Sequence, residues 1–155
     1  DHRDLHSFPT RRSSDLKFGV IALIALAHDL LITISVFAVF GISINSPFIA
    51  AVLTIVGYSI NATIVIFDRI RENLKLSGRT SAAEVANKSV TQTMARSINT
   101  TLTTLFTIVA VYIFVPTVRG FSLPIIIGII SGLFSSVFIA PSLWVLVTEK
   151  KKKSK

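Results

Sequence analysis

The side chains of this sequence with the clearest capacity for chemistry lie inside long apolar runs. His28 and Asp29 interrupt one run near its middle, and the carboxyl group of Asp29 can take and release a proton. If the run crosses a bilayer, a charged side chain there costs about 3 kcal/mol, so Asp29 needs a hydrogen-bonding partner, water or a bound proton. Ion transfer and a helix-packing hydrogen bond explain the pair equally well.

Two other sets of polar residues recur at the spacing of one helix face. Tyr58 and Asn61 follow Thr54 on one face of a second apolar run. Arg96 begins a face of a third run that continues through Asn99, Thr100, Thr103 and Thr107. Such faces can hydrate ions or join helices through hydrogen bonds. Composition alone favours helix joining, because such bonds are common between membrane helices.

No combination of residues predicts an enzyme, a metal site or a cofactor. The chain has no cysteine, and His2 and His6 lie in an atypical N-terminal segment, which leaves His28 as an isolated histidine. The sequence contains no HExxH motif, no G-x-S-x-G motif and no Gly-rich phosphate loop. We therefore expect a protein that is not an enzyme and has neither catalytic residues nor a cofactor.

The composition is that of a membrane protein. Hydrophobic residues make up 51% of the 155-residue chain and charged residues 15%, against about a quarter in soluble domains. The net charge of +8 favours contact with a lipid surface. We do not expect nucleic acid as a partner, because 11 of the 14 aromatic residues are Phe and the sequence has no basic patch with aromatic residues that could stack on bases.

Four apolar runs are the elements that must position the polar residues. They cover residues 18–40, 47–67, 98–115 and 121–147. Each is long enough to cross the hydrocarbon core as a helix, which takes about 17–25 residues. A soluble bundle is the alternative for one such run but a poor one for four. We therefore predict an all-α, polytopic membrane helix bundle with four transmembrane helices.

The fourth run also carries a stripe of small residues at intervals of four. Its members are Gly128, Gly132, Ser136 and Ala140. Small side chains let two helix backbones approach closely. We expect this stripe to serve helix packing.

The link between the second and third runs is long but patterned. Gly78 ends the second helix, and Ser81 with Glu84 forms a capping-box pattern that starts a new one. Small and apolar residues then recur every four positions, at Ala82, Ala86, Val90, Met94 and Ile98. This spacing predicts a cytoplasmic amphipathic helix that runs into the third span.

Positive charges set the expected orientation. Six Lys or Arg residues lie between residues 68 and 97, and residues 150–155 form a basic tail, whereas the other two links share Arg119 alone. The positive-inside rule therefore places both termini and the middle link in the cytoplasm. The basic tail serves as a topology anchor at the bilayer, with binding of anionic lipid as the alternative.

Residues 1–16 differ from the rest of the chain in composition. They contain no apolar run, so they are not a signal peptide. The stretch SFPTRRSSDL resembles translated sequencing-adapter sequence. We expect a non-native leader here, or else a disordered one, and place the membrane domain at residues 17–149.

Four sequence blocks resemble one protein family, in the same order along the chain. They are AHDLLIT (27–33), GYSINATIVIFDRIRENL (57–74), NKSVTQTMARSINT (87–100) and RGF (119–121). Together they resemble the SecF subunits of the bacterial SecDF protein-export complex, which belong to the resistance-nodulation-division (RND) superfamily. The resemblance runs from residue 17 to residue 147.

The resemblance implies a multi-pass protein of the bacterial plasma membrane that assists Sec-dependent export by using the proton- or cation-motive force. It implies SecD and the SecYEG translocon as partners, with YajC and YidC as further candidates. The chain matches the last four of six RND-type helices, so the extracytoplasmic domain that would hold exported polypeptides is missing, as in a truncated gene. The alternatives are a non-conducting scaffold subunit of the translocon and a fragment of another RND-type transporter.

The resemblance also assigns candidate site residues. Arg96 follows the TQT-like motif and supplies a fixed positive charge, while Asn61 and Tyr58 form hydrogen bonds along the ion path. Asp29 and His28 are secondary candidates for that path. The residues that close the GYSIN block form a motif at the cytoplasmic end of the helix, namely Asp68, Arg69, Arg71 and Glu72.

One position departs from the family pattern. Many members have Asp directly after the Asn of GYSIN, where this chain has Ala62. Asn61 cannot titrate in place of a carboxylate. Three explanations stay open: SecD supplies the carboxylate opposite Arg96, the chain couples a different ion, or it has a purely structural role.

Overall fold

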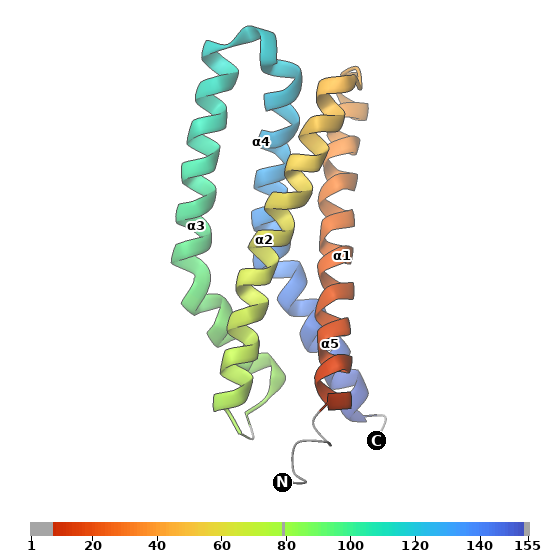
Figure 1. The fold of residues 1–155 in the computed structure, drawn as a ribbon, viewed down its shortest axis with the longest axis vertical. Helices are drawn as coiled ribbons and strands as arrows, with labels where there is room; N and C mark the ends of the chain where they lie inside the picture. The colour runs from red at the N-terminus through yellow and green to blue at the C-terminus, as the bar shows by residue number, and fades with distance from the viewer. Residues whose placement is uncertain (1–7, 79, 154–155) are drawn as a thin grey trace.

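The computed structural model describes residues 8–78 and 80–153, and every element within them is helical. The elements are α1 (Phe8–Val39), α2 (Ser46–Leu76), α3 (Ala82–Phe114), the 3₁₀ turn η1 (Pro116–Val118), α4 (Arg119–Phe134), the π-helical turn η2 (Ser135–Ile139) and α5 (Ala140–Lys153). The helices run alongside one another as a bundle (Figure 1). This arrangement confirms the predicted all-α class.

Four stretches of the described residues are long and apolar enough to cross a membrane. They are Asp15–Val39, Ser46–Leu76, Ala82–Phe114 and Pro116–Lys150, which confirms the prediction of four spans. The helix α1 begins at Phe8, inside the segment 1–16 that was set apart by composition. Residues 1–7 lie outside the described residues, and the division of the chain into a leader, a membrane domain and a tail stays a prediction.

The helix ends follow the predicted local signals. Asn45 caps α2 by accepting a hydrogen bond from the amide of Phe48, and Pro47 lies in the first turn. The α2–α3 connection contains Gly78 at a φ of +49°, a conformation that side chains disfavour. Ser81 and Glu84 then form the predicted capping box at the start of α3.

The predicted amphipathic helix is the first half of α3 and is continuous with the third span. Ala86 is buried, and Ala82, Val90 and Met94 pack beside it against the main apolar core. Ile98, the last member of the stripe, is exposed. The cytoplasmic location of this segment stays a prediction.

The fourth span is interrupted, which the sequence analysis did not predict. Between α4 and α5 the chain forms a π-helical turn, in which the amide of Ala140 bonds to the carbonyl of Ser135, five residues earlier. Pro141 follows at once and has no amide hydrogen to donate to the carbonyl of Val137. A widened turn is one way in which a helix accommodates such a proline.

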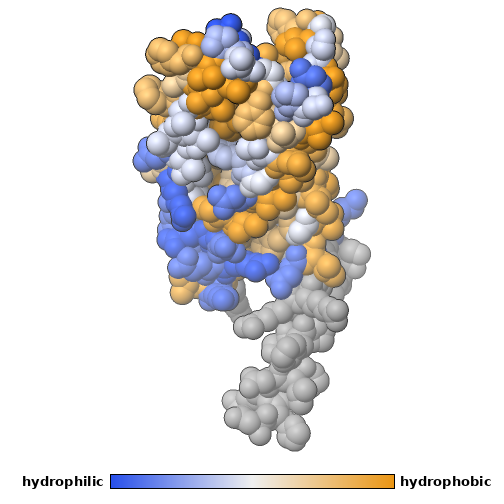
Figure 2. All heavy atoms as spheres, turned by 45° about the horizontal axis from the view of Figure 1, so that its top comes forward, coloured by the Kyte–Doolittle hydropathy of each residue, from blue (hydrophilic) through white to orange (hydrophobic). Residues whose placement is uncertain are grey.

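The core lies between α1, α2, the fourth span and the first turns of α3. A main cluster joins Phe18, Ile66 and Trp144 near one end of the bundle, and a smaller one joins Ala51, Ile125 and Ile129. Only 6% of the residues in the most apolar stretch of α3 are buried, because α3 lies against one side of the bundle (Figure 1). Much of the outer surface is hydrophobic, and hydrophilic residues gather toward one end (Figure 2).

Candidate functional site

The carboxyl group of Asp29 is fully buried at the point where α1, α2 and the fourth span meet. Its Oδ2 atom accepts hydrogen bonds from the hydroxyls of Ser59 at 2.6 Å and Ser135 at 2.8 Å. Its Oδ1 atom accepts one from Ser131 at 2.9 Å. We call Asp29 and these three serines the Asp29 cluster. The three serines supply the hydrogen bonds that a buried carboxylate needs and that lipid cannot provide.

His28 is the titratable residue that pairs with Asp29 among the described residues. Its Nδ1 atom lies 3.3 Å from Oδ1 of Asp29, and its side chain is 33% exposed. The structure thus keeps the predicted His28–Asp29 pair together, but it gives Asp29 hydroxyl groups as its main partners. Thr33 adds a bond to the backbone carbonyl of Asp29.

A small cavity lies between α2, α3 and the π-helical turn. It has a volume of about 100 Å³, enough for a few water molecules. Its lining includes Tyr58, Asn61, Ala62 and Arg96, four positions that the sequence analysis singled out. We call it the Arg96 cavity. The hydroxyl of Tyr58 closes part of its wall by contacting the hydroxyl of Thr101 at 2.6 Å.

The Arg96 cavity and the Asp29 cluster adjoin at Gly132. A Cβ atom built on Gly132 would lie 3.6 Å from Oδ2 of Asp29 and 3.5 Å from the ring of Tyr58. Leu133, near the end of α4, and Ser136, in the π-helical turn, line the cavity. Asp29 is therefore separated from the cavity by a glycine without a side chain and by the ring of Tyr58.

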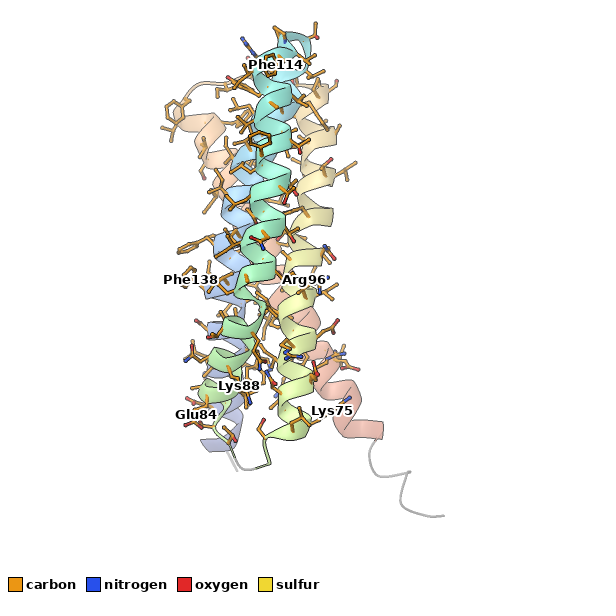
Figure 3. All side chains as sticks on the ribbon, turned by 90° about the vertical axis from the view of Figure 1, so that its left-hand side faces the viewer. Lys75, Glu84, Lys88, Arg96, Phe114 and Phe138 are labelled. Atoms are coloured by element: carbon orange, nitrogen blue, oxygen red, sulfur yellow. The ribbon has the colours of Figure 1, made fainter. Side chains whose placement is uncertain are left out.

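The outer side of the Arg96 cavity is formed by exposed polar residues. Asn61, Arg96 and Thr100 are exposed in this chain. Arg96 extends from the side of α3 near α2 (Figure 3). An arginine on the lipid-facing side of a span is costly, so this side of the bundle fits contact with protein or water better than contact with lipid.

The threonine face of α3 does not join helices within this chain. Thr103 and Thr107 are exposed, and each donates its hydroxyl to the backbone carbonyl four residues earlier. Thr54 of α2 does the same. The contact between hydroxyl groups that does join α2 to α3 is that of Tyr58 with Thr101, a residue beside this face.

The residues of the predicted cytoplasmic-end motif join α2 to its neighbours. Arg69 pairs with Glu72 on its own helix and donates to Gln92 of α3. Arg71 pairs with Asp15 of α1 at 2.6 Å and lies over the ring of Phe18. These contacts lie along the outside of the bundle, and Asp68 is exposed. Their role in function stays a prediction.

The small-residue stripe is divided between packing and the site. A Cβ on Gly128 would lie 2.4 Å from Ile55, so the two helices are in close contact there, and Ala140 is buried in the main core. Gly132 and Ser136, by contrast, border the Arg96 cavity and the Asp29 cluster. Gly128 and Ala140 therefore serve helix packing as predicted, whereas Gly132 and Ser136 also lie beside the candidate site.

Sequence reasoning missed the partners of Asp29. Ser131 and Ser135 lie four apart, one helix position away from the stripe that was noted, and Ser59 lies inside the GYSIN block. A serine in a helix commonly bonds to its own backbone, so its presence alone does not predict an interhelical contact. The sequence signal for these contacts was a single carboxylate within the apolar runs together with serines on other spans.

Comparison with known proteins places the chain in a family. Residues 14–150 match the family model described as protein export membrane protein SecD/SecF, C-terminal. The protein translocase subunit SecF of Alicyclobacillus acidocaldarius is 48% identical over 135 residues, which cover 84% of this chain and 44% of that protein. The SecF subunit of Desulfurispirillum indicum is 44% identical, with shares of 84% and 43%.

A SecDF protein and a solved SecDF structure are similar to the chain over the same region. The protein translocase subunit SecDF of Thermus thermophilus is 43% identical over 139 residues, covering 89% of this chain and 19% of that protein. A crystal structure of SecDF in its super-membrane-facing form matches with a TM-score of 0.85 and 42% identity, over 89% of this chain and 19% of the other. This chain spans less than half the length of these relatives. It belongs to the SecD/SecF C-terminal family of protein export membrane proteins.

Proposed function

We propose that this chain is the membrane part of an export-assisting SecF subunit and that the Arg96 cavity is part of its ion path. The observation that carries the proposal is the convergence of Tyr58, Asn61, Ala62 and Arg96 on one cavity in a chain of this family. A fixed positive charge beside a small polar cavity stabilises the ionised form of a carboxyl group placed there, and intramembrane charges mark ion pathways. The relatives are named as translocase subunits, which supports a transport role rather than an enzymatic one.

A SecD chain is the proposed partner at the exposed side of the Arg96 cavity. In the Thermus thermophilus relative, SecD and SecF sequences are named as one protein, SecDF. Arg96 and Asn61 are exposed here, and a partner that covers them could supply the carboxylate that Ala62 lacks. The SecYEG translocon, YajC, YidC and exported polypeptides are proposed as more distant partners on the strength of family membership.

The proposed location is the bacterial inner membrane, with both ends of the chain in the cytoplasm. The start of α1, the end of α5 and the α2–α3 connection lie at the same end of the bundle (Figure 1). Lys75 and Lys88, on either side of the α2–α3 connection (Figure 3), therefore lie at the same end of the bundle as Lys150 at the end of α5, which is the pattern that the positive-inside rule expects of a cytoplasmic end.

Substitution of Arg96 tests the ion path. In the native gene product that contains these residues, we expect Arg96→Ala to abolish the part of export that depends on the ion gradient, because the cavity loses its fixed charge. The measurement is translocation of a secretory protein into membrane vesicles with and without the gradient. Lys88→Ala is the matched control, since Lys88 is an exposed cation of α3 outside this cavity. Unchanged gradient-dependent export in Arg96→Ala would favour the non-conducting scaffold.

Restoration of the carboxylate at position 62 gives a second, independent measurement. Ala62 lines the cavity, so Ala62→Asp would place a titratable group beside Arg96. We expect the pH or sodium dependence of export to change. Dependence that stays the same would place the coupling site elsewhere in the complex.

A further inference from the structure

The Asp29 cluster lies beside the Arg96 cavity, and none of its four residues lines that cavity. Asp29 is the only acidic residue within the four apolar runs, and its side chain is fully buried. Three hydroxyls, one each from α2, α4 and the π-helical turn, donate hydrogen bonds to its two oxygen atoms. A carboxylate held in this way is a site that can take a proton, since hydroxyl groups can either donate or accept a hydrogen bond.

Ser135 differs from the other serines of the cluster because its hydroxyl has two acceptors. Its Oγ atom lies 2.8 Å from Oδ2 of Asp29 and 3.3 Å from the backbone carbonyl oxygen of Gly132. A hydroxyl carries one hydrogen, so it can donate fully to one acceptor at a time. For Ser59 and Ser131, Asp29 is the acceptor found in the described part of the structure.

We propose that Asp29 is a proton-binding site and that the hydroxyl hydrogen of Ser135 transmits its charge state to the π-helical turn. When Asp29 is ionised, Ser135 donates to Oδ2. When a hydronium ion that reaches the cluster gives its proton to Oδ2 and leaves as water, the new carboxyl hydrogen points to Oγ of Ser135. The Ser135 hydrogen then turns to the carbonyl of Gly132. This inference rests on the proposed function, because it supplies the titratable group of that ion path.

The position of Gly132 makes the transfer relevant to the rest of the site. Its carbonyl lies where α4 ends and the π-helical turn begins. Leu133 of α4 and Ser136 of the turn line the Arg96 cavity. A stronger hydrogen bond from the Ser135 hydroxyl to the Gly132 carbonyl, which already accepts the Ser135 amide, therefore acts on the wall of that cavity, and π-helical turns are frequent at functional sites.

The titratable groups near Asp29 lie on its own helix and on α2, α3 and the fourth span. On its own helix, His28 contacts it from a partly exposed position. From α2, Tyr58 lies on the other side of Gly132, and from α3, Arg96 lies in the adjoining cavity. The fourth span contributes serines to the cluster, and its titratable residues, Arg119, Glu149 and Lys150, lie at its two ends.

Infrared difference spectroscopy tests the proposal on the 155-residue chain in lipid nanodiscs. The chain is labelled with ¹³C at its glycine carbonyls, and spectra are compared between acidic and alkaline buffer. We expect two pH-dependent features: a protonated carboxyl band from Asp29, and a glycine-carbonyl band that moves to lower frequency at acidic pH. Asp29→Asn should abolish both, and Gly132→Ala should remove the glycine band and so assign it.

Two serine variants separate transmission from a general structural effect. Ser135→Ala should keep the carboxyl band and lose the glycine response. Ser122→Ala is the matched control, since Ser122 is a buried serine of α4 that donates to the carbonyl of Val118, and it should keep both features. Circular dichroism confirms that each variant is folded.

The outcomes are distinct. A chain without a pH-dependent carboxyl band would overturn the proton site, and a glycine response that persists in Ser135→Ala would overturn the transmission. Neither measurement depends on export or on Arg96, so a failure of this inference can be distinguished from a failure of the proposed function.

Discussion

At the scale of single residues, one carboxyl group connects three parts of the bundle. Asp29 of α1 accepts from Ser59 of α2, from Ser131 of α4 and from Ser135 of the π-helical turn. Each such bond between membrane helices contributes about 0.6 kcal/mol on average, so the stabilisation is modest. The bonds matter more for the specificity of helix packing, because they fix which side chains lie beside the carboxylate.

Two glycines one turn apart should respond differently to the same substitution. At Gly128 a methyl group would lie 2.4 Å from the fully buried side chain of Ile55, so Gly128→Ala should lower the free energy of unfolding by about 1–3 kcal/mol. At Gly132 the nearest atoms are 3.5 Å away, and Gly132→Ala should fold with little change in stability. Thermal unfolding in detergent measures both.

The pair is its own control, since both changes add one methyl group to the same helix. Equal stability of the two variants would contradict the close contact of α4 with α2 at Gly128. Partial recovery in Gly128→Ala/Ile55→Val would support it, because that double variant removes a methyl group at the point of overlap.

At the scale of elements, α2 and α3 form a hairpin that a buried amide holds together. Asn73 is 4% exposed and donates hydrogen bonds to Ser89 at 2.8 Å and Gln92 at 2.9 Å. This contact lies near the connection between the helices, before their spans diverge around the Arg96 cavity. The hairpin thereby sets the register of Ala62 against Arg96.

Loss of the buried amide should therefore weaken the hairpin. Asn73→Ala removes both bonds and leaves the buried hydroxyl of Ser89 with its own helix as partner, and we expect a loss of about 1–3 kcal/mol in stability. Amide hydrogen exchange across the ends of α2 and α3 should rise at the same time, as mass spectrometry can measure.

Asp15→Asn is the comparison for this prediction. It breaks the ion pair with Arg71, whose two side chains are 42% and 58% exposed, and exposed pairs contribute little. A loss of stability in Asp15→Asn as large as that in Asn73→Ala would show that the exposed ion pair, not the buried amide, holds this end of the bundle.

At the scale of the whole molecule, the α2–α3 connection, with Lys75 and Lys88 beside it, lies at one end, and the turn at residues 116–118 lies at the other (Figure 1). The positive-inside rule then predicts one orientation for all four spans together. The chain has no cysteine, which makes it suited to single-cysteine labelling.

Labelling from outside the cell should distinguish the two ends. Thr117 and Glu84 are both exposed residues outside the apolar core. We expect Thr117→Cys to react with a membrane-impermeant maleimide in intact spheroplasts, and Glu84→Cys to react only after the membrane is opened. The opposite pattern would invert the proposed orientation while leaving the fold unchanged.

Much of the fold could be predicted from local signals. Hydropathy alone located the four spans, and the Ser81–Glu84 pattern located the start of α3. These predictions succeed because a backbone in lipid must satisfy its hydrogen bonds within each helix, so length and apolarity decide the element. The π-helical turn was missed, although Pro141 was the signal for it, because a proline in a membrane helix is compatible with several local distortions.

The sequence by itself determined the four helices, their ends, the family and the polar positions of interest. Only the tertiary structure decided that Ser131 and Ser135 reach Asp29, more than a hundred residues away along the chain, and that Arg96 shares a cavity with Ala62. Helix formation depends on neighbours within one turn. The partners of a buried carboxylate depend instead on how helices rotate and pack against one another, which no local pattern encodes.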